Sequence, residues 1–272
     1  MSTRDSALIN QASVVNRSQT DDLKLAKQVL QIENDGLVAL ADSLGKEFVD
    51  ALDILQAIDG RVVVTGMGKS GHIGRKIAFT LASTGIPSFF VHPGEASHGD
   101  LGMIDKSDAV IAISNSGETP EMSDLVAYTR RFKVPLIAIT SNEKGTISEQ
   151  ADLTLLLPRV KEACPMGLAP TTSTTMAQAL GDTIAVALMN RLGFTLDDFN
   201  LRHPGGQLGK RLLKISDIMH TGDAIPVTNG KSLMSEVIPD MTACLLYTSD
   251  AADQRSSIDL GGRSIIKKNR GG

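Results

Sequence analysis

The sequence predicts an α/β protein built on a mostly parallel sheet with helices covering both faces. Five short apolar runs recur between residues 61 and 157, separated by segments long enough for helices. Each run is continuously apolar rather than alternating, which is typical of strands buried on both faces of a parallel sheet. The 272 residues, 42% of them hydrophobic, suffice for one large domain with an appended segment.

The expected elements follow in order along the chain. Residues 1–20 are polar and aperiodic, so we expect a disordered N-terminal segment, and over residues 23–44 apolar side chains recur at helical spacing. The expected strands are 62–65, 88–91, 109–113, 135–139 and 153–157. A long helix is expected over 171–190, with Gly193 as its C-terminal stop.

The composition changes after the long helix, which indicates further parts of the chain. We expect a main domain over 21–212, the start of a smaller module over 213–243 and a tail over 244–272. The tail is rich in Ser, Asp and Arg and continues no earlier pattern. We interpret it as a foreign or frame-shifted extension, with a natural disordered tail as the alternative.

Composition and charge exclude several classes of protein. The net charge is -4, Trp is absent and aromatic residues make up 3%, so the chain lacks the basic surface and stacking side chains of a nucleic-acid-binding protein. No apolar run approaches the roughly 18 residues that a membrane span requires. The N-terminus lacks a secretory signal pattern, so we expect a cytoplasmic protein. Cys164 and Cys244 form neither a disulfide framework nor a CxxC metal motif.

A glycine-rich turn follows the first expected strand directly. It contains Gly66, Gly68 and Gly71, and residues 75–83 can then form a helix. A helix that begins after such a turn presents unpaired backbone N–H groups and the positive end of its dipole at one point. We therefore expect this turn to bind an anion, and phosphate is the obvious one.

Three other interpretations of this turn are weaker. The glycine spacing fits the G-x-G-x-x-G motif of dinucleotide-binding proteins, but the second strand ends in His92 and Pro93, whereas that motif needs an acidic residue for the ribose. Lys69 and Ser70 match the end of a Walker motif, but Val63 stands where its opening glycine is required. A tight turn without a ligand is the remaining alternative.

A polar turn follows the third expected strand. Residues 114–119, Ser-Asn-Ser-Gly-Glu-Thr, carry hydroxyl and amide side chains at the carboxyl end of a buried strand, and Pro120 can begin the next helix. Open α/β sheets bind ligands at this edge, so these neutral donors can surround a phosphate. Hydroxyl residues also fill 171–175 at the start of the long helix, where N-capping would need only one of them.

These segments together resemble the sugar isomerase (SIS) domain and, more narrowly, the bacterial D-arabinose 5-phosphate isomerases. The resemblance rests on GMGKSGHIGRK at 66–76, PSFFVHPGEASHGDLGM at 87–103, AISNSGET at 112–119, KEACPMGLAPTTSTT at 161–175 and HPGGQLGKRL at 203–212. It implies a five-stranded parallel sheet flanked by helices, in a flavodoxin-like three-layer sandwich, a homotetramer and a following pair of CBS repeats. The chain departs from the family after about Met241, so 213–243 is expected to be a truncated CBS module.

The resemblance also assigns residues to the sugar phosphate and to its reacting end. The residues that match the family's phosphate site are Ser70, Ser114, Asn115, Ser116 and Thr119. Those that match the reacting end are Lys69, Glu121, Glu162 and His203. His98 is expected to line the pocket or to contact another subunit. Neither a metal nor an organic cofactor is implied.

Side-chain chemistry suggests what the residues at the reacting end would do. Aldose–ketose isomerisation moves a proton between adjacent carbons through an enediol, and Glu162, just beyond the fifth strand, is a plausible base for this step. His203 would open the sugar ring or shuttle protons, and which of the two is the base stays open. Lys69 would neutralise the phosphate or the developing enediolate. Glu121 begins a helix, where a carboxylate equally stabilises the helix dipole.

A metal is the alternative reading of one further segment. Residues 92–100 contain two histidines and two acidic residues, a composition that could bind zinc. Their spacing fits no standard zinc motif, so we expect no metal site there.

The implied function is the interconversion of D-arabinose 5-phosphate and D-ribulose 5-phosphate, for Kdo and lipopolysaccharide synthesis. A sugar-phosphate-binding regulator without turnover is the alternative, because SIS domains serve in both roles. The joint presence of Glu121, Glu162 and His203 favours the enzyme, since a sensor needs no acid–base groups. A nicotinamide-dependent oxidoreductase is disfavoured by the missing ribose acid.

Overall fold

The computed structural model of the chain describes residues 19–203, 219, 230–235 and 238. The chain divides into two compact units, residues 1–212 and 213–272. The expected N-terminal segment lies outside the described residues up to residue 18, as does the tail over 244–272. Most of the expected CBS module lies outside them too, so these domain assignments stay predictions.

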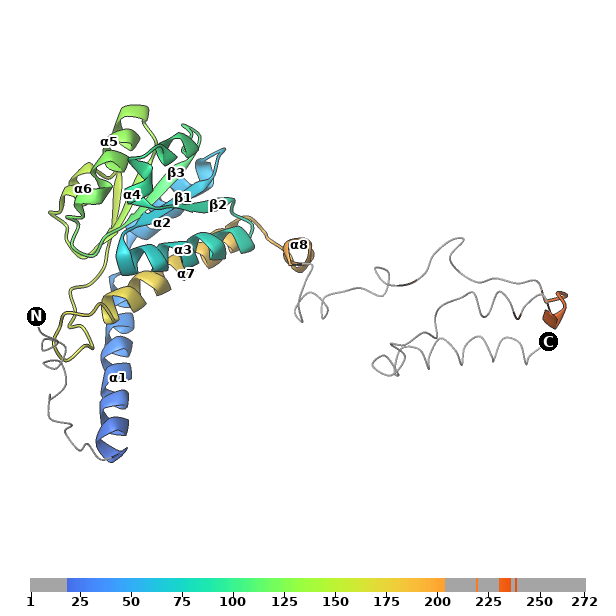
Figure 1. The fold of residues 1–272 in the computed structure, drawn as a ribbon, viewed down its shortest axis with the longest axis horizontal. Coiled ribbons are helices and arrows are strands. Elements are labelled where there is room, and N and C mark those ends of the chain that lie inside the picture. Colours follow the sequence, from blue (N-terminus) through green and yellow to red (C-terminus); the bar gives the residue numbers. More distant parts are fainter. Residues whose placement is uncertain (1–18, 204–218, 220–229, 236–237, 239–272) are drawn as a thin grey trace, which may run out of the picture. The chain divides into compact units, whose positions relative to one another are not determined.

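The first unit contains a sheet of five parallel strands, which confirms the predicted α/β fold class (Figure 1). The strands are β1 (Val62–Gly66), β2 (Ser88–Val91), β3 (Ala109–Ile113), β4 (Leu136–Thr140) and β5 (Leu153–Leu156). They lie in the order β2-β1-β3-β4-β5. Each expected strand is present with its ends shifted by at most one residue, because a run buried on both faces has few alternative structures.

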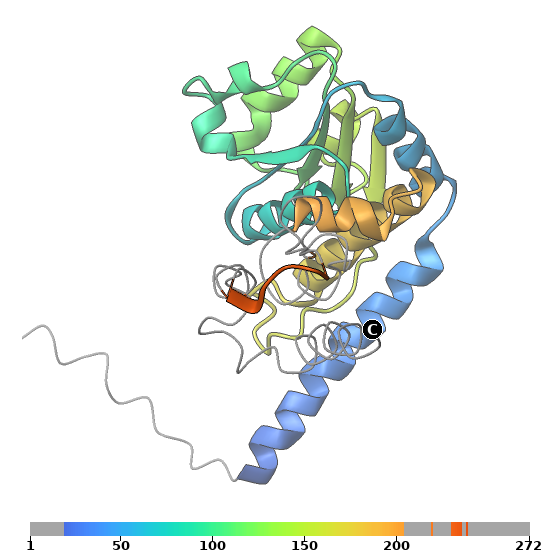
Figure 2. The same ribbon diagram turned by 90° about the vertical axis from the view of Figure 1, so that its right-hand side faces the viewer.

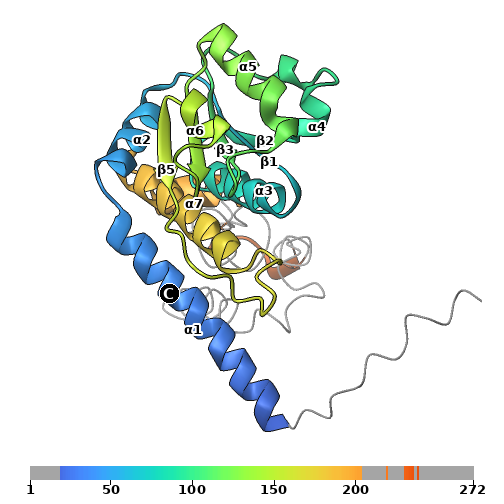
Figure 3. The ribbon, with the colours of Figure 1, turned by 90° about the vertical axis from the view of Figure 1, so that its left-hand side faces the viewer.

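Helices cover the two faces of this sheet. The helices of the described residues are α1 (Gln19–Ser43), α2 (Lys46–Ala57), α3 (Gly68–Ser83), α4 (Pro93–Ala96), α5 (Ser123–Phe132), α6 (Thr146–Gln150), α7 (Thr172–Arg191) and α8 (Leu196–Arg202), with short 3-10 turns η1 (Asp100–Met103) and η2 (Pro120–Met122). Helices α2, α3 and α7 lie on one side and α4, α5 and α6 on the other, so the unit has three layers (Figures 2 and 3). Among the described residues, no helix is both long and apolar enough to cross a bilayer.

The central strands divide their side chains between two hydrophobic cores. In β1, Val62 and Val64 pack in the core shared with α2, α3 and α7, whereas Val63 packs in the core shared with α5 and α6. Strands β3 and β4 alternate in the same way, and every residue of these three strands is buried. Burial on both faces is the physical reason for the continuously apolar runs.

Four helices differ from the sequence prediction. Helix α3 begins at Gly68 rather than at residue 75, so the glycine-rich segment forms the first turns of the helix instead of a loop. Helices α2 and α8 are absent from the prediction. Helix α2 follows α1 after two residues, and α8 is only seven residues long, although Thr195 and Asp198 form a capping box at its start. Helix α1 begins at Gln19, which is two residues before the expected domain boundary.

Close backbone approaches explain the glycines of this turn. A Cβ atom on Gly71 would lie 2.5 Å from the carbonyl oxygen of Gly66, and one on Gly74 would lie 3.1 Å from the ring of Phe90. Gly68 has φ +55°, a left-handed conformation that glycine adopts without strain. The glycines therefore let α3 start directly against the end of β1.

Helices α3 and α7 both follow a strand and both begin at the carboxyl edge of the sheet. Gly181 of α7 lets the two helices approach closely, since a Cβ there would lie 2.3 Å from Cδ1 of Ile77. Lys76 and Asp182 form an ion pair beside this contact. The packing places the N-termini of α3 and α7 on the same side of the molecule (Figure 1).

A methyl group at residue 71 is expected to open this turn. The substitution Gly71→Ala places a carbon against a backbone oxygen that cannot rotate away, so we expect the free energy of unfolding to fall by about 1–3 kcal/mol. Gly102→Ala is the matched control, because nothing lies within 4 Å of its added Cβ. Its expected change is below about 0.5 kcal/mol. Urea unfolding followed by circular dichroism compares the two, and equal losses would contradict the role of Gly71.

Candidate functional site

Two turns meet at the carboxyl edge of the sheet, where the strand order reverses. Gly66 at the end of β1 pairs with Ile113 at the end of β3, so the glycine turn lies beside the residues that follow Ile113. After β1 the chain enters α3 on one face of the sheet, and after β3 it enters η2 and α5 on the other face. Open α/β sheets bind ligands in the crevice that such diverging connections leave.

The N-terminus of α3 forms one wall of this crevice. Its N-cap, Met67, provides no side-chain hydrogen bond, so the first backbone N–H groups remain available to an anion. Lys69 and Ser70 lie in the first turn, with Lys69 exposed and Ser70 half-buried. This wall therefore offers a hydroxyl, an ammonium group and the positive end of the helix dipole.

The turn after β3 forms the other wall, and part of its hydroxyl set is used internally. The Ser114 Oγ lies 2.7 Å from the Thr119 Oγ1 and accepts the Gly117 N–H at 3.1 Å. The Ser116 Oγ accepts the Glu118 N–H at 3.2 Å. Ser114 is buried, whereas Asn115 and Ser116 are exposed. The five predicted phosphate-binding residues thus lie on adjoining turns, but Ser114 and Thr119 first shape the turn itself.

Residues after β4 fix the backbone of this second turn. Asn142 donates from Nδ2 to the Ser116 carbonyl at 2.9 Å, and the Ser141 backbone N–H and hydroxyl both donate to the Asn115 carbonyl. Arg159 holds Ser141 in turn, donating from Nε to its carbonyl at 3.0 Å. The sequence prediction misses Ser141, Asn142 and Arg159, because no motif marks them.

Glu118 joins the same turn to the start of α6. Its carboxylate accepts the Thr146 hydroxyl at 2.6 Å and the Thr146 backbone N–H at 3.0 Å. These hydrogen bonds hold the pKa of Glu118 below its usual range. The turn after β3 is therefore anchored at Asn115, Ser116 and Glu118, which holds its backbone in place.

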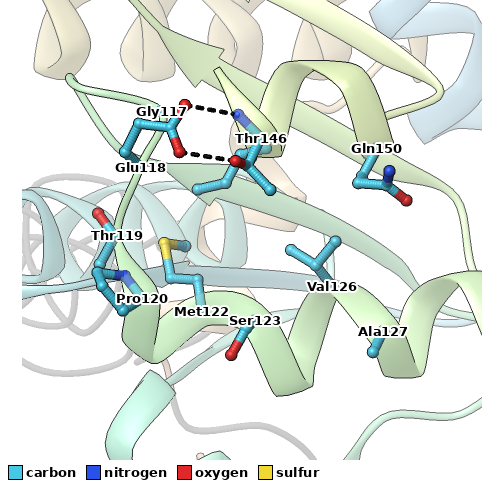
Figure 4. Close-up of a pocket in the computed structure, with 11 residues that line it drawn as sticks. Gly117, Glu118, Thr119, Pro120, Met122, Ser123, Val126, Ala127, Thr146 and Gln150 are labelled. Carbon is cyan, nitrogen blue, oxygen red and sulfur yellow. Dashed lines mark hydrogen bonds between the residues drawn. The ribbon is translucent and has the colours of Figure 1, made fainter.

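A groove of about 360 Å³ lies next to these turns, between α5 and α6 (Figure 4). Thr119 and Glu118 line its end, together with apolar side chains such as Met122, Val126 and Ile147. Ser70, Ser114 and Ser116 do not line it. The groove is therefore a neighbour of the crevice and not the crevice itself.

Glu162 binds the N-terminus of α7. Its Oε2 accepts the Thr171 N–H at 2.7 Å, the Thr171 hydroxyl at 2.9 Å and the Ser173 N–H at 3.3 Å. Its Oε1 accepts the Ser173 hydroxyl. Burial of the half-buried carboxylate raises its pKa, but the hydrogen bonds from Ser173 and Thr171 outweigh burial and leave the pKa of Glu162 lowered. The expected base is thus ionised at neutral pH and held by two neighbouring residues.

Glu121 and His98, like Lys69 and Glu162, lie beyond the carboxyl ends of strands. Glu121 lies exposed in η2, directly after the turn that follows β3. His98 lies exposed after α4, which follows β2. Lys69, Glu121 and Glu162 therefore all follow the carboxyl ends of strands. Among the described residues, no group of three or more His, Cys, Asp and Glu side chains could hold a metal ion.

His203 lies at the opposite end of the sheet from these groups. Phe194, which precedes α8, packs on Gly85 before β2, and Arg202 lines a groove with Arg61 and Ser88, where β1 and β2 begin. His203 follows directly and stacks on Phe199 with ring centroids 3.9 Å apart. The five residues of β1 span about 15 Å. Within a single chain His203 therefore lies away from the carboxyl edge, and its expected place at the reacting end stays a prediction.

Fold and site define a class of protein, and comparison with known proteins agrees with it. The SIS domain family matches residues 55–187, which contain both turns, Glu162 and most of α7. The structure of c3406 from E. coli CFT073, in complex with arabinose 5-phosphate, is 42% identical, with a TM-score of 0.67. The similarity covers 69% of this chain and all of that one. The chain thus contains a SIS domain.

Curated relatives narrow the family further. The arabinose 5-phosphate isomerase KdsD of Salmonella typhi is 49% identical over 240 residues, which is 88% of this chain and 73% of the relative. The KdsD of Pseudomonas aeruginosa is 50% identical over 222 residues, or 80% of this chain and 68% of the relative. The chain belongs to the arabinose 5-phosphate isomerase family, which confirms the resemblance stated from the sequence.

Loss of the Glu162 carboxylate is expected to destabilise the protein in a pH-dependent way. Glu162→Ala removes the side chain that caps α7, so the free energy of unfolding at pH 7 should fall by about 1 kcal/mol. Because the folded pKa is lowered, this stabilisation is present above the ordinary carboxyl pKa and is lost as the pH falls through the folded value. The gap to wild type should therefore be full above the ordinary carboxyl pKa of about 4.3 and should narrow as the pH falls below it.

Denaturant unfolding at pH 7 and pH 3 measures this gap. Glu143→Ala is the control, because Glu143 is an exposed carboxylate after β4. We expect the control to track wild type at both pH values. A Glu162→Ala deficit that persists unchanged at pH 3 would show that the carboxylate charge is not what stabilises α7.

Proposed function

We propose that this protein is an aldose–ketose isomerase that interconverts D-arabinose 5-phosphate and D-ribulose 5-phosphate through an enediol. The proposal rests on one juxtaposition. The pairing of Gly66 with Ile113 places the uncapped N-terminus of α3 beside the serine-rich turn, residues 114–119. This juxtaposition occurs in a chain that is 49% identical to an arabinose 5-phosphate isomerase. Dipole, hydroxyl and amide donors suit a sugar phosphate. A regulator would need this cradle alone, and membership of a family of isomerases favours the enzyme.

The proposed chemistry is a proton transfer between C1 and C2 of the open-chain sugar. In the aldose-to-ketose direction a base takes the proton from C2, the electron pair of that bond forms the C1–C2 double bond, and the carbonyl oxygen on C1 takes a proton. The enediol then loses the proton on the C2 oxygen, and C1 receives the proton that the base holds. We assign the carbon proton to Glu162, whose ionised carboxylate can accept it at neutral pH.

Negative charge develops on the sugar oxygens while the proton moves between C2 and C1, and this charge requires stabilisation. Lys69 is exposed in the first turn of α3, where its ammonium group can face either the phosphate or the enediolate oxygen. Glu121 lies in the 3-10 turn on the other wall. We assign Glu121 to the proton traffic between the two oxygens.

We further propose that His203 reaches the site from a second copy of the chain. Within one chain it lies where the strands begin, so a role at the reacting end requires a partner whose α8 faces the carboxyl edge. A homotetramer with closed symmetry can make such a contact reciprocal. His98, exposed beyond β2, is the residue of this edge that we assign to the pocket rim or to a subunit contact.

The remaining expectations follow from the family. We propose that the enzyme works in the cytoplasm without metal or other cofactor, and that it supplies D-arabinose 5-phosphate to Kdo and lipopolysaccharide synthesis. Residues 213–243 are proposed to be the start of a CBS module.

An assay of the purified protein tests the reaction. We expect D-arabinose 5-phosphate and D-ribulose 5-phosphate to interconvert, other aldose phosphates to react more slowly, and a chelator to leave the rate unchanged. In deuterated water the proton on C2 of the aldose should exchange. Glu162→Gln should lower that exchange at least about 1000-fold while the substrate still binds, because the amide cannot accept the carbon proton.

The alternatives give different results in the same assay. Binding of D-arabinose 5-phosphate by calorimetry without turnover would favour the regulator. Wild-type turnover with undiminished exchange in Glu162→Gln would reject Glu162 as the base. A rate that disappears with chelator and returns with a divalent metal would contradict catalysis without metal.

Mixed oligomers test the contribution of a second copy. Glu162→Gln and His203→Ala chains are each expected to be inactive, and co-expression with two different tags yields assemblies containing both. If each site takes Glu162 from one chain and His203 from another, random mixing restores about a quarter of the wild-type activity. If both residues act within one chain, no mixed assembly contains a complete site and activity stays at the level of the single variants.

A further inference from the structure

We infer that Ser173 and Thr171 are positioning residues that orient Glu162 so that its Oε1, and not its Oε2, exchanges the proton with the sugar carbons. This inference rests on the proposed function, because it concerns the base of that reaction. Neither residue belongs to the phosphate-binding or reacting-end sets expected from the sequence. Simple helix capping needs a single residue, so it accounts for only one of the five hydroxyl residues at 171–175.

The two carboxylate oxygens of Glu162 have different surroundings. Oε2 accepts three hydrogen bonds, from the N–H and hydroxyl of Thr171 and from the N–H of Ser173. Oε1 accepts the Ser173 hydroxyl. A carboxylate oxygen has two lone pairs, so three donors occupy Oε2 fully while Oε1 keeps a lone pair that can take a proton.

The start of α7 also accepts hydrogen bonds from the loop that carries Glu162. The Ala163 N–H donates to the Thr171 Oγ1 at 2.9 Å and to the Thr172 Oγ1 at 3.1 Å. Thr172 is fully buried and Ser173 is 7% exposed, so these hydroxyls have little freedom to move. Gly36 of α1 lies against Thr172, since a Cβ there would be 2.6 Å from its Cγ2. Helix α1 thus closes the far side of this arrangement.

This arrangement gives more than a helix cap does. A cap satisfies one or two N–H groups with one side chain, whereas here two hydroxyls of the helix donate back to the carboxylate. The side-chain torsions of Glu162 are therefore set by contacts at both oxygens. Such fixed placement is what a base requires when it removes a proton from one carbon and returns it to the next.

The Ser173 hydroxyl also stabilises the ionised form of the base. Its donation to Oε1 and the donors on Oε2 lower the pKa of Glu162 despite burial. Removing the hydroxyl must raise that pKa toward the ordinary value. A merely structural hydroxyl would change stability and leave the titration of the base unchanged, so the pH profile separates the two roles.

The experiment compares Ser173→Ala and Thr171→Val with Thr183→Ala in the full-length protein. Thr183 lies on the same helix, is exposed, and donates to the Ala179 carbonyl. With D-arabinose 5-phosphate, Ser173→Ala should lower kcat about 10- to 100-fold with a much smaller change in KM. The acid limb of its kcat–pH profile should move to higher pH, because the carboxylate becomes easier to protonate. Thr171→Val should move the limb in the same direction, and Thr183→Ala should match wild type.

Each outcome decides between the inference and the proposed function. The inference is overturned if Ser173→Ala and Thr171→Val both fold, keep the wild-type kcat and leave the acid limb of the pH profile unmoved. In that case an inactive Glu162→Gln still supports Glu162 as the base. Retained exchange in Glu162→Gln would overturn both. If Ser173→Ala does not fold, Thr171→Val carries the test, and circular dichroism of each variant establishes which case applies.

Discussion

The parallel pairing of β1 with β3 is the constraint on which the site depends. Because Gly66 pairs with Ile113, the two turns that follow these strands start side by side and then diverge to opposite faces of the sheet. Gly71 allows α3 to begin immediately, with its N-terminus still at the sheet edge. A longer turn would carry the helix dipole away from the serine-rich loop. The position of the proposed anion site is therefore fixed by packing before any ligand contact is made.

Rigidity of the serine-rich turn follows from hydrogen bonds among polar residues. Ser114 and Thr119 bind each other, and Ser116 and Asn115 accept donors from the residues after β4. These contacts use part of the donor set that the sequence suggests for the phosphate. In return the remaining donors, backbone N–H groups and exposed hydroxyls, are held in place. Preorganised donors of this kind lose little entropy when a ligand binds.

The sequence predicts the sheet well because each strand carries its own signal, an apolar run that only a two-sided core accommodates. It predicts the helices less well. Helix α3 starts inside a glycine-rich segment, which local propensity disfavours and tertiary packing against β1 permits. The partners of Glu162 are nine and eleven residues away along the chain, and no spacing rule links them. The location of His203 depends on α8, whose seven residues give too weak a pattern to predict.

The lowered pKa of Glu162 has two opposing effects on the proposed chemistry. It guarantees an ionised base at neutral pH, but a carboxylate held by four donors is a weaker base toward a carbon acid. The activation barrier must then be lowered mainly by stabilisation of the enediolate, because the enediolate is the product of the proton transfer and the base itself cannot become stronger. Lys69 and the dipole of α3 form one wall of the crevice, where in the proposed mechanism negative charge on the sugar oxygens would develop. In the proposed mechanism helix N-termini would therefore serve both partners of the proton transfer: α7 would hold the base, and α3 would face the charge that the base creates.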